Sequence, residues 1–228
     1  YSKAASSGNY SKAASSGNSS TAASSGNYST AASSGNSSAC SALGFRAAVK
    51  GDMGNLLMAS EYVNKDDKYI PVCGKADLVD GKKLKPNRWY IVESGEWVEV
   101  DLSDGIFGRV LSNRSGVKKI KLDSGDIYFV VSDENGNTAH GKTIKEARAD
   151  LVFKNVAKFD GEVPKSATGA EWVGIYRAIT GACAAGVKMF VESNEIDLSK
   201  NYKAAAVAKL VTGHYGAEQF SKKIAGGK

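Results

Sequence analysis

One stretch of the chain has the spacing of a phosphate-binding loop. Residues 136–143 read GNTAHGKT, which fits the pattern G-x-x-x-x-G-K-[ST] through Gly136, Gly141, Lys142 and Thr143. In nucleotide-binding proteins such a loop follows a strand and opens a helix, so that backbone amides and the lysine meet the phosphates. Here the apolar run IYFVV precedes the loop and a helical pattern follows it. The motif would place a nucleotide site at Lys142.

The surroundings of this motif favour a structural role. The turn VSDENG separates the apolar run from Gly136, NTAH has the pattern of a short returning strand, and no later strand ends in an aspartate that would hold magnesium. Thr143 and Glu146 have the spacing of a capping box before a helix. We therefore expect a hairpin followed by a helix cap, and no cofactor.

The histidines and cysteines form no recognisable ligand pattern; they are His140, His214, Cys40, Cys73 and Cys183. Neither histidine has a cysteine or carboxylate at metal-ligand spacing, and three widely spaced cysteines do not suggest disulfides. Cys183 could act as a nucleophile with His214 or His140, but ITGACAAGVKMF has the pattern of one helix with a small face that packs closely, which favours a core role. We expect no catalytic residue and no metal site. The reduced cysteines indicate a bacterial host cytoplasm or the inside of a phage particle.

The first 36 residues are four near-copies of a nine-residue unit, YSKAASSGN, YSKAASSGN, SSTAASSGN and YSTAASSGN. Such a composition is common in flexible linkers, but a linker has no reason to hold a strict phase. A fixed short period indicates that each unit stacks on another. In an extended Ser-x-Ala segment both side chains point inward, and Gly-Asn would supply the positive φ of a sharp corner. Because nine residues are too few to enclose a core, we expect a β-solenoid with two nonapeptides per turn.

Outward side chains of this predicted coil form a candidate contact surface. With two nonapeptides per turn, Tyr10 lies directly above Tyr28, with Lys12 and Thr30 beside them. An exposed ladder of aromatic rings and hydroxyls suits contact with a protein or a glycan. The same ladder could serve to stabilise the sheet by stacking.

The repeat resembles two groups of proteins. SGNYSTAASSGNSSA is similar to the small-residue β-roll of trimeric adhesin heads, although this chain lacks their longer repeat and heptad stalk. The nonapeptides followed by ALGFRAAVKGDMGNLLMASEY resemble more closely a poorly characterised group of proteins from phages, prophages and gut bacteria. This resemblance covers residues 1–62 and brings no known activity with it. The divergent unit SSACSALGF and the strand NLLMASEY are expected to cap the open end of the stack.

The remainder of the chain changes pattern twice. From Tyr62 to His140, runs such as RWYIVES and EWVEVDL alternate with Gly-containing turns and predict an antiparallel meander. From Thr143 the period becomes helical, and we expect helices over 144–159, 171–193, 202–212 and 217–224. The predicted domains are a solenoid with its cap over 1–62, a β-meander over 63–140 and a helical region packed on the meander over 141–228. The last two would form an α+β domain with a small helical bundle.

Charge and hydropathy set limits on partners. The net charge of +6 comes from scattered lysines and arginines, which permits nucleic-acid binding without indicating it. No apolar run approaches the ~18 residues of a membrane-spanning helix, so we expect no membrane contact. Because the chain begins at Tyr1 inside the repeat, further repeats are expected upstream.

These observations together predict a non-enzymatic protein-interaction or structural module of a phage or mobile-element protein. The solenoid would act as a spacer or recognition surface, with a protein partner or a homo-oligomer as its contact. Two alternatives stay open. One is a phage-encoded inhibitor of a host defence or nucleic-acid enzyme, and the other is a nucleotide-dependent enzyme that uses the GNTAHGKT loop.

Overall fold

A computed structural model describes residues 1–156 and 162–226 of the chain. The chain divides into two compact units, Tyr1–Val100 and Asp101–Lys228. The boundary expected after residue 62 lies inside a strand of the first unit, and the boundary expected after residue 140 lies inside the last strand of the meander.

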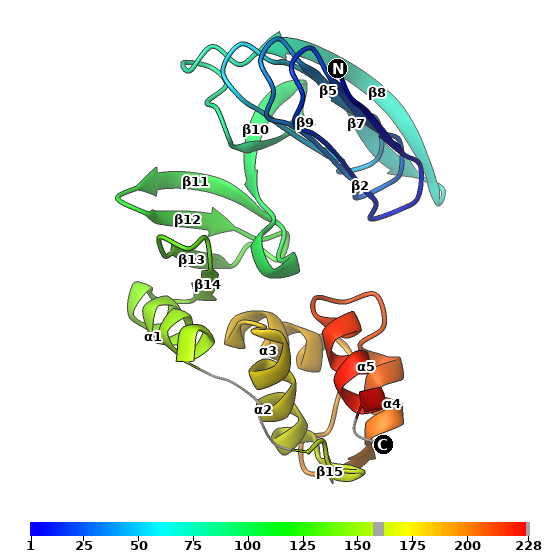
Figure 1. The fold of residues 1–228 in the computed structure, drawn as a ribbon, viewed down its shortest axis with the longest axis vertical. Coiled ribbons are helices and arrows are strands. Elements are labelled where there is room, and N and C mark those ends of the chain that lie inside the picture. The colour runs from blue at the N-terminus through cyan, green and yellow to red at the C-terminus, as the bar shows by residue number, and fades with distance from the viewer. Residues whose placement is uncertain (157–161, 227–228) are drawn as a thin grey trace. The chain divides into compact units, whose positions relative to one another are not determined.

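The first unit contains the β-solenoid that the repeat predicts (Figure 1). Its strands alternate between two parallel stacks. One stack holds β1 (Lys3–Ser6), β3 (Thr21–Ser24) and β5 (Ala39–Ala42), and the other holds β2 (Lys12–Ser15), β4 (Thr30–Ser33) and β6 (Ala48–Gly51). Pairing joins residues eighteen positions apart, so that Ala4 lies beside Ala22 and Ala13 lies beside Ala31. Equivalent residues of the repeat therefore pair in register along each stack.

The interior of the solenoid is built from small side chains. Ala13, Ala22, Ala31 and Cys40 are buried, and burial raises the pKa of the Cys40 thiol to about 11. Buried serine hydroxyls pair across the interior, as in Ser29 Oγ to Ser24 Oγ at 2.9 Å. Because these hydroxyls have hydrogen-bond partners, the thin interior tolerates polar groups without the cost of leaving them unsatisfied.

The corners of the coil differ in detail from the prediction. The positive φ expected at Gly-Asn falls one residue later, for example at Tyr10 (58°) and Tyr28 (55°). Asn9, Asn18 and Asn27, which precede these turns, bond to the next coil; Asn9 Oδ1, for example, accepts the N–H of Asn27 at 3.1 Å. Gly26, Gly35 and Gly44 allow close approach of successive coils rather than an unusual φ, since a Cβ atom at each would meet backbone atoms of the preceding coil.

Larger residues close the end of the stack. Strand β7 (Leu56–Lys65) adds to β5 in parallel, and β8 (Lys68–Leu78) pairs with β7 as an antiparallel edge. The hairpin of β9 (Trp89–Glu93) and β10 (Glu96–Asp101) meets β6 where Tyr90 pairs with Val49. Leu57, Val79, Leu84 and Tyr90 extend the alanine interior into an ordinary apolar core.

The second unit begins with a short 3-10 turn, Ser103–Gly105, and an antiparallel meander. Its strands are β11 (Gly108–Arg114), β12 (Val117–Lys121), β13 (Ile127–Ser132) and β14 (Thr138–Gly141). Helix α1 (Ile144–Val156) packs against β13 and β14 through a small core that includes Val131, Ala139 and Ala147.

The helices after α1 share a core around Trp172, Tyr176 and Phe220. They are α2 (Gly169–Thr180), α3 (Ala184–Ser193), α4 (Ala204–Leu210) and α5 (Ala217–Gly226), accompanied by the short pair β15 (Ser166–Thr168) and β16 (Asn201–Lys203). None of the described helices is both long and apolar enough to cross a membrane.

The single helix expected over 171–193 was wrong. Gly181 has φ 68° and ends α2 in the left-handed conformation, and Cys183 begins α3. A glycine at this position commonly terminates a helix, because the left-handed conformation costs glycine little. The expected helix over 144–159 reaches Val156 within the described residues, and residues 157–159 lie outside them.

Candidate functional site

The candidate contact surface contains a row of aromatic rings in contact with one another at one corner of the solenoid. Tyr10 and Tyr28 lie parallel, with ring centroids 5.0 Å apart and planes 5° apart. Phe45 meets Tyr28 edge-on at 5.5 Å, and Tyr69 of β8 stacks on Phe45 at 4.3 Å. The stacked pair that the eighteen-residue spacing predicted is therefore part of a row of four rings in contact, which also includes Phe45 and Tyr69.

Backbone contacts hold these rings in place. The N–H of Tyr10 donates to Asn27 O at 2.9 Å, and the N–H of Tyr28 donates to Phe45 O at 2.8 Å. Tyr10 is 71% exposed, whereas Tyr28 is half-buried, and its pKa is raised by burial and by contact with Tyr69. Lys12 and Thr30 pair in register on the adjoining strands. All four expected residues thus lie along the same part of the coil.

The GNTAHGKT residues are used in a hairpin and a helix start. Gly136 lies in the turn before β14, and His140 pairs with Val130 in the meander. The Lys142 N–H donates to Glu146 Oε2 at 2.9 Å, and Thr143 Oγ1 accepts the N–H of Glu146 at 3.2 Å. Gly136 precedes β14, whereas Gly141 is the last residue of that strand and pairs with Phe129, so their backbone amides do not form one phosphate-sized cradle.

A cysteine, a histidine and two aspartates converge inside the second unit. His140 Nδ1 lies 3.8 Å from Cys183 Sγ and 3.2 Å from Asp104 Oδ2. On the other side of the ring, His140 Nε2 lies 3.7 Å from Asp101 Oδ1, which is too long for a hydrogen bond. Asp101 therefore acts on the imidazole as a buried charge. The His140 side chain is 0% exposed.

Each aspartate in this cluster is also bound by a lysine. Lys154 Nζ donates to Asp104 Oδ1 at 2.6 Å, and Lys118 Nζ donates to Asp101 Oδ2 at 2.5 Å. Burial opposes charge on His140, but Asp101 and Asp104 outweigh it and raise the pKa of His140 to about 10. Burial likewise opposes charge on Asp101, yet His140 and Lys118 hold its pKa below the usual range. The arrangement therefore favours an imidazolium between two carboxylates.

The local structure directs Cys183 toward this imidazole. Cys183 is the N-cap of α3, with φ −72° and ψ 150°, and its sulfur accepts the Gly186 N–H at 3.2 Å. Asp150 of α1 fixes the start of α3, because its carboxylate accepts the N–H of Ala184 and binds Arg177 of α2. Asp104 is held in the left-handed region, with φ 55° and ψ 21°. Strained backbone of this kind is often found at functional sites.

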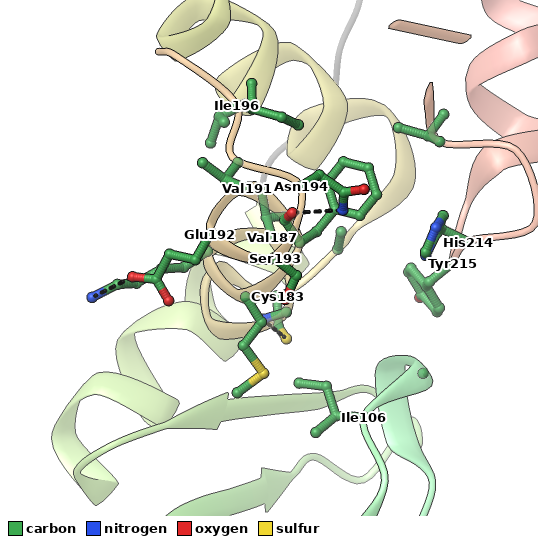
Figure 2. Close-up of a pocket in the computed structure, with 18 of the residues that line it drawn as sticks. Ile106, Cys183, Val187, Val191, Glu192, Ser193, Asn194, Ile196, His214 and Tyr215 are labelled. Carbon is green, nitrogen blue, oxygen red and sulfur yellow. Dashed lines mark hydrogen bonds and ion pairs between the residues drawn. The ribbon is translucent and has the colours of Figure 1, made fainter. Parts of the chain in front are cut away.

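An open cavity of about 640 Å³ reaches the cluster at Cys183 and Asp104. Figure 2 shows Cys183 at the start of α3 beside Ile106, with His214 and Tyr215 on another side of the cavity. Most of the lining is apolar, and it includes Trp172, Val187, Val191 and Ile196. Lys142 also lines the cavity. The lining of the cavity therefore suits a molecule with an apolar portion.

The sequence offers both histidines as partners for Cys183 and favours a core role for this cysteine. The structure brings His140 beside Cys183, whereas His214 packs edge-on against Phe190 with centroids 4.7 Å apart. Nothing in the spacing of Asp101 and Asp104 along the sequence links them to His140. Gly181, two residues before Cys183, was the available signal that the apparent helix ends there.

Asp104, His140 and Cys183 also place three atoms of metal-ligand type within 4.8 Å of one another. Comparison of the chain with protein-family models, with curated proteins and with solved structures finds no match.

Proposed function

We propose that the solenoid unit is a protein-interaction or structural module of a phage or mobile-element protein. In this proposal each coil consists of two nonapeptides, and the stack serves as a spacer that presents a contact surface. The C-terminal unit would be an α+β domain that docks or oligomerises. The origin in a phage or mobile element is supported by the resemblance of the repeat and its cap to such proteins.

The observation that supports a contact role is the row of rings from Tyr10 to Tyr69. Aromatic side chains dominate the energy of many protein interfaces, since they bury much apolar area and keep few rotatable bonds. Here the rings are already fixed by stacking and by the backbone, so binding would cost little additional side-chain conformational entropy. Lys12 adds a positive charge beside the row. A partner protein or a second copy of the chain suits this surface, and a glycan could also stack on it.

Light scattering of the full chain tests the proposal. Trimers or fibrous oligomers that dissociate in Tyr10→Ala/Tyr28→Ala, but not in the control Tyr1→Ala, would support contact through the stack. Tyr1 is fully exposed and belongs to no ring pair in the described residues, so its replacement controls for loss of a surface tyrosine. An oligomer unaffected by the double variant would contradict the role of the stack. A monomer would favour the alternative of a phage-encoded inhibitor.

A further inference from the structure

We propose that Cys183 is the nucleophile of an acyl-transfer site, with His140 as its proton donor and acceptor and with the apolar cavity holding the acyl group. This inference concerns the second unit and goes beyond the contact role of the solenoid. It rests on the convergence of the thiol, the imidazole and the carboxylates, and on the open cavity that Cys183 and Asp104 line.

The geometry has the three parts that activate a nucleophilic thiol. The thiol lies within reach of a histidine, the histidine is oriented by carboxylates, and the sulfur lies at a helix N-terminus. The Gly186 N–H points at the sulfur, and a helix N-terminus favours negative charge at that point. Asp104 and Asp101 approach different nitrogens of His140 and thereby fix the orientation of its ring.

Two lysines balance the two carboxylates of the cluster. Asp101 and Asp104 are balanced by Lys118 and Lys154, which leaves the pair of Cys183 and His140 to be neutral as a whole. Neutrality of the pair is compatible with transfer of one proton between Cys183 and His140, which leaves the total charge of the cluster unchanged. A divalent cation in the same place would lie beside Asp104, whose carboxylate already binds Lys154. The Lys154 side chain is only 7% exposed. The lysines therefore favour thiol chemistry over a metal centre.

Disulfide chemistry within this unit has no second thiol to use. Cys40 and Cys73 both belong to the first unit, and all three cysteines are free. Acyl transfer needs only one thiol, together with water as the second reactant. The apolar lining indicates a substrate with an aliphatic or aromatic acyl part, and its leaving group would be an amine, an alcohol or a thiol.

The reaction proceeds in two steps. The Cys183 thiolate attacks the carbonyl carbon and forms a C–S bond, the bond from that carbon to the leaving group breaks, and the His140 imidazolium gives its proton to the leaving group. Neutral His140 then takes a proton from water as the water oxygen attacks the thioester. The C–S bond breaks, the acid leaves, and the thiolate and imidazolium are restored.

Alkylation of the unmodified chain gives the first test, since the three cysteines serve as internal controls. Cys183 is 1% exposed and Cys40 is 0% exposed, whereas Cys73 is half-buried. If exposure alone decided reactivity, iodoacetamide would label Cys73 first and Cys183 about as slowly as Cys40. We expect Cys183 to be labelled at least tenfold faster than Cys73 at pH 7, as measured by peptide mass spectrometry over time. Labelling in the order of exposure would overturn the proposal.

Acyl trapping tests the reaction itself. Incubation with p-nitrophenyl octanoate is expected to place one octanoyl group on Cys183, removable by hydroxylamine, and more rapidly than p-nitrophenyl acetate places an acetyl group. Cys183→Ala should lose the adduct, while the control Cys73→Ser should keep it. An adduct absent from Cys183, or equally abundant on Cys73, would contradict the assignment.

His140→Asn separates a catalytic imidazole from a structural one. The variant should slow alkylation of Cys183 at least tenfold and leave alkylation of Cys73 unchanged, which reports a local effect even if the second unit loses stability. Metal analysis of the purified wild-type chain completes the test. If one zinc ion is found per chain and Cys183 is labelled only after chelation, the result would contradict the thiol nucleophile and indicate a metal centre.

Discussion

Gly35 lies directly against the carbonyl oxygen of Gly17 in the neighbouring coil, so closely that a Cβ atom at Gly35 would stand 2.0 Å from that oxygen. The same contact recurs between Gly26 and Gly8. Neither Gly35 nor Gly26 has a positive φ, so the glycines are required by the spacing of the coils rather than by their own backbone conformation. The glycines of the repeat therefore determine how closely successive coils can stack.

Gly35→Ala is expected to destabilise the solenoid by about 1–3 kcal/mol, because the new methyl group must push two backbone segments apart. Gly8→Ala is the matched control. The Cβ atom added at Gly8 would have Ser11 Cβ as its nearest neighbour at 3.8 Å, which is an ordinary van der Waals contact. Chemical denaturation followed by circular dichroism measures both variants. Equal stability of the two variants would show that the coils are less tightly stacked than described.

Ala31→Leu or Ala22→Leu is expected to cost about 1–3 kcal/mol or more, since both alanines are fully buried between the two stacks and the interior has no room for a larger side chain. Lys12→Leu replaces an exposed residue of β2 and should leave the melting temperature nearly unchanged. Thermal melts of the three variants check this inside-outside assignment. A loss of stability in Lys12→Leu as large as that in Ala31→Leu would contradict it.

Much of the fold could be predicted because the relevant signals are local or repeated. The phase of Ala22 and Ala31 defines an interior, and the dipeptides Ser94-Gly95 and Ser115-Gly116 place two hairpin turns, where all four residues have positive φ. The position of a positive φ at Tyr28 rather than at Gly-Asn was not predictable, since it depends on how successive corners bond to one another.

The candidate thiol site could not be predicted from spacing. His140 and Cys183 stand 43 positions apart and meet only because α3 packs on the meander. The short pair of β15 and β16 also escaped prediction, since three-residue strands carry no periodic signal. Between α2 and α3 the small residues of ITGACAAG preserve a helix-like composition, and only the left-handed conformation of Gly181 reveals the break.

Thr143→Ala is expected to cost about 1 kcal/mol of stability in the absence of any ligand, because Thr143 Oγ1 accepts the Glu146 N–H at the start of α1. Lys142→Ala is the matched control, since the backbone N–H that bonds Glu146 is retained. Urea denaturation should place Lys142→Ala within about 0.5 kcal/mol of the wild type. A larger loss in Lys142→Ala than in Thr143→Ala would contradict the cap.

Millimolar ATP or GTP with magnesium is expected to leave the melting temperature unchanged. A ligand that binds the folded chain raises this temperature by mass action, but the amides of GNTAHGKT pair within a hairpin and do not converge on an anion. Differential scanning fluorimetry measures the shift. A rise in melting temperature that disappears in Lys142→Ala would favour the nucleotide-dependent enzyme over the interaction module.

The stability of the second unit is expected to fall as the pH rises from neutrality toward 10. The groups that face His140 are Asp101, Asp104 and Cys183, with Lys118 and Lys154 bound to the two carboxylates. The pKa of His140 is raised to about 10 in the folded chain, against ~6.5 for an unfolded histidine. Because the folded state holds the proton more tightly, its contribution to stability is fully present below about pH 6.5 and is lost as the pH passes through the folded pKa.

Melting temperatures measured between pH 6 and 10 check this dependence. The wild type should lose stability across the range, and His140→Gln, which cannot carry the charge, should show a flatter profile even though its stability at pH 6 is lower. His214→Gln removes the chain's other histidine, which packs against Phe190, and is expected to retain the wild-type slope. If His140→Gln kept the full slope, the imidazolium between Asp101 and Asp104 would not be its source, and the cluster would have to hold His140 in the neutral form.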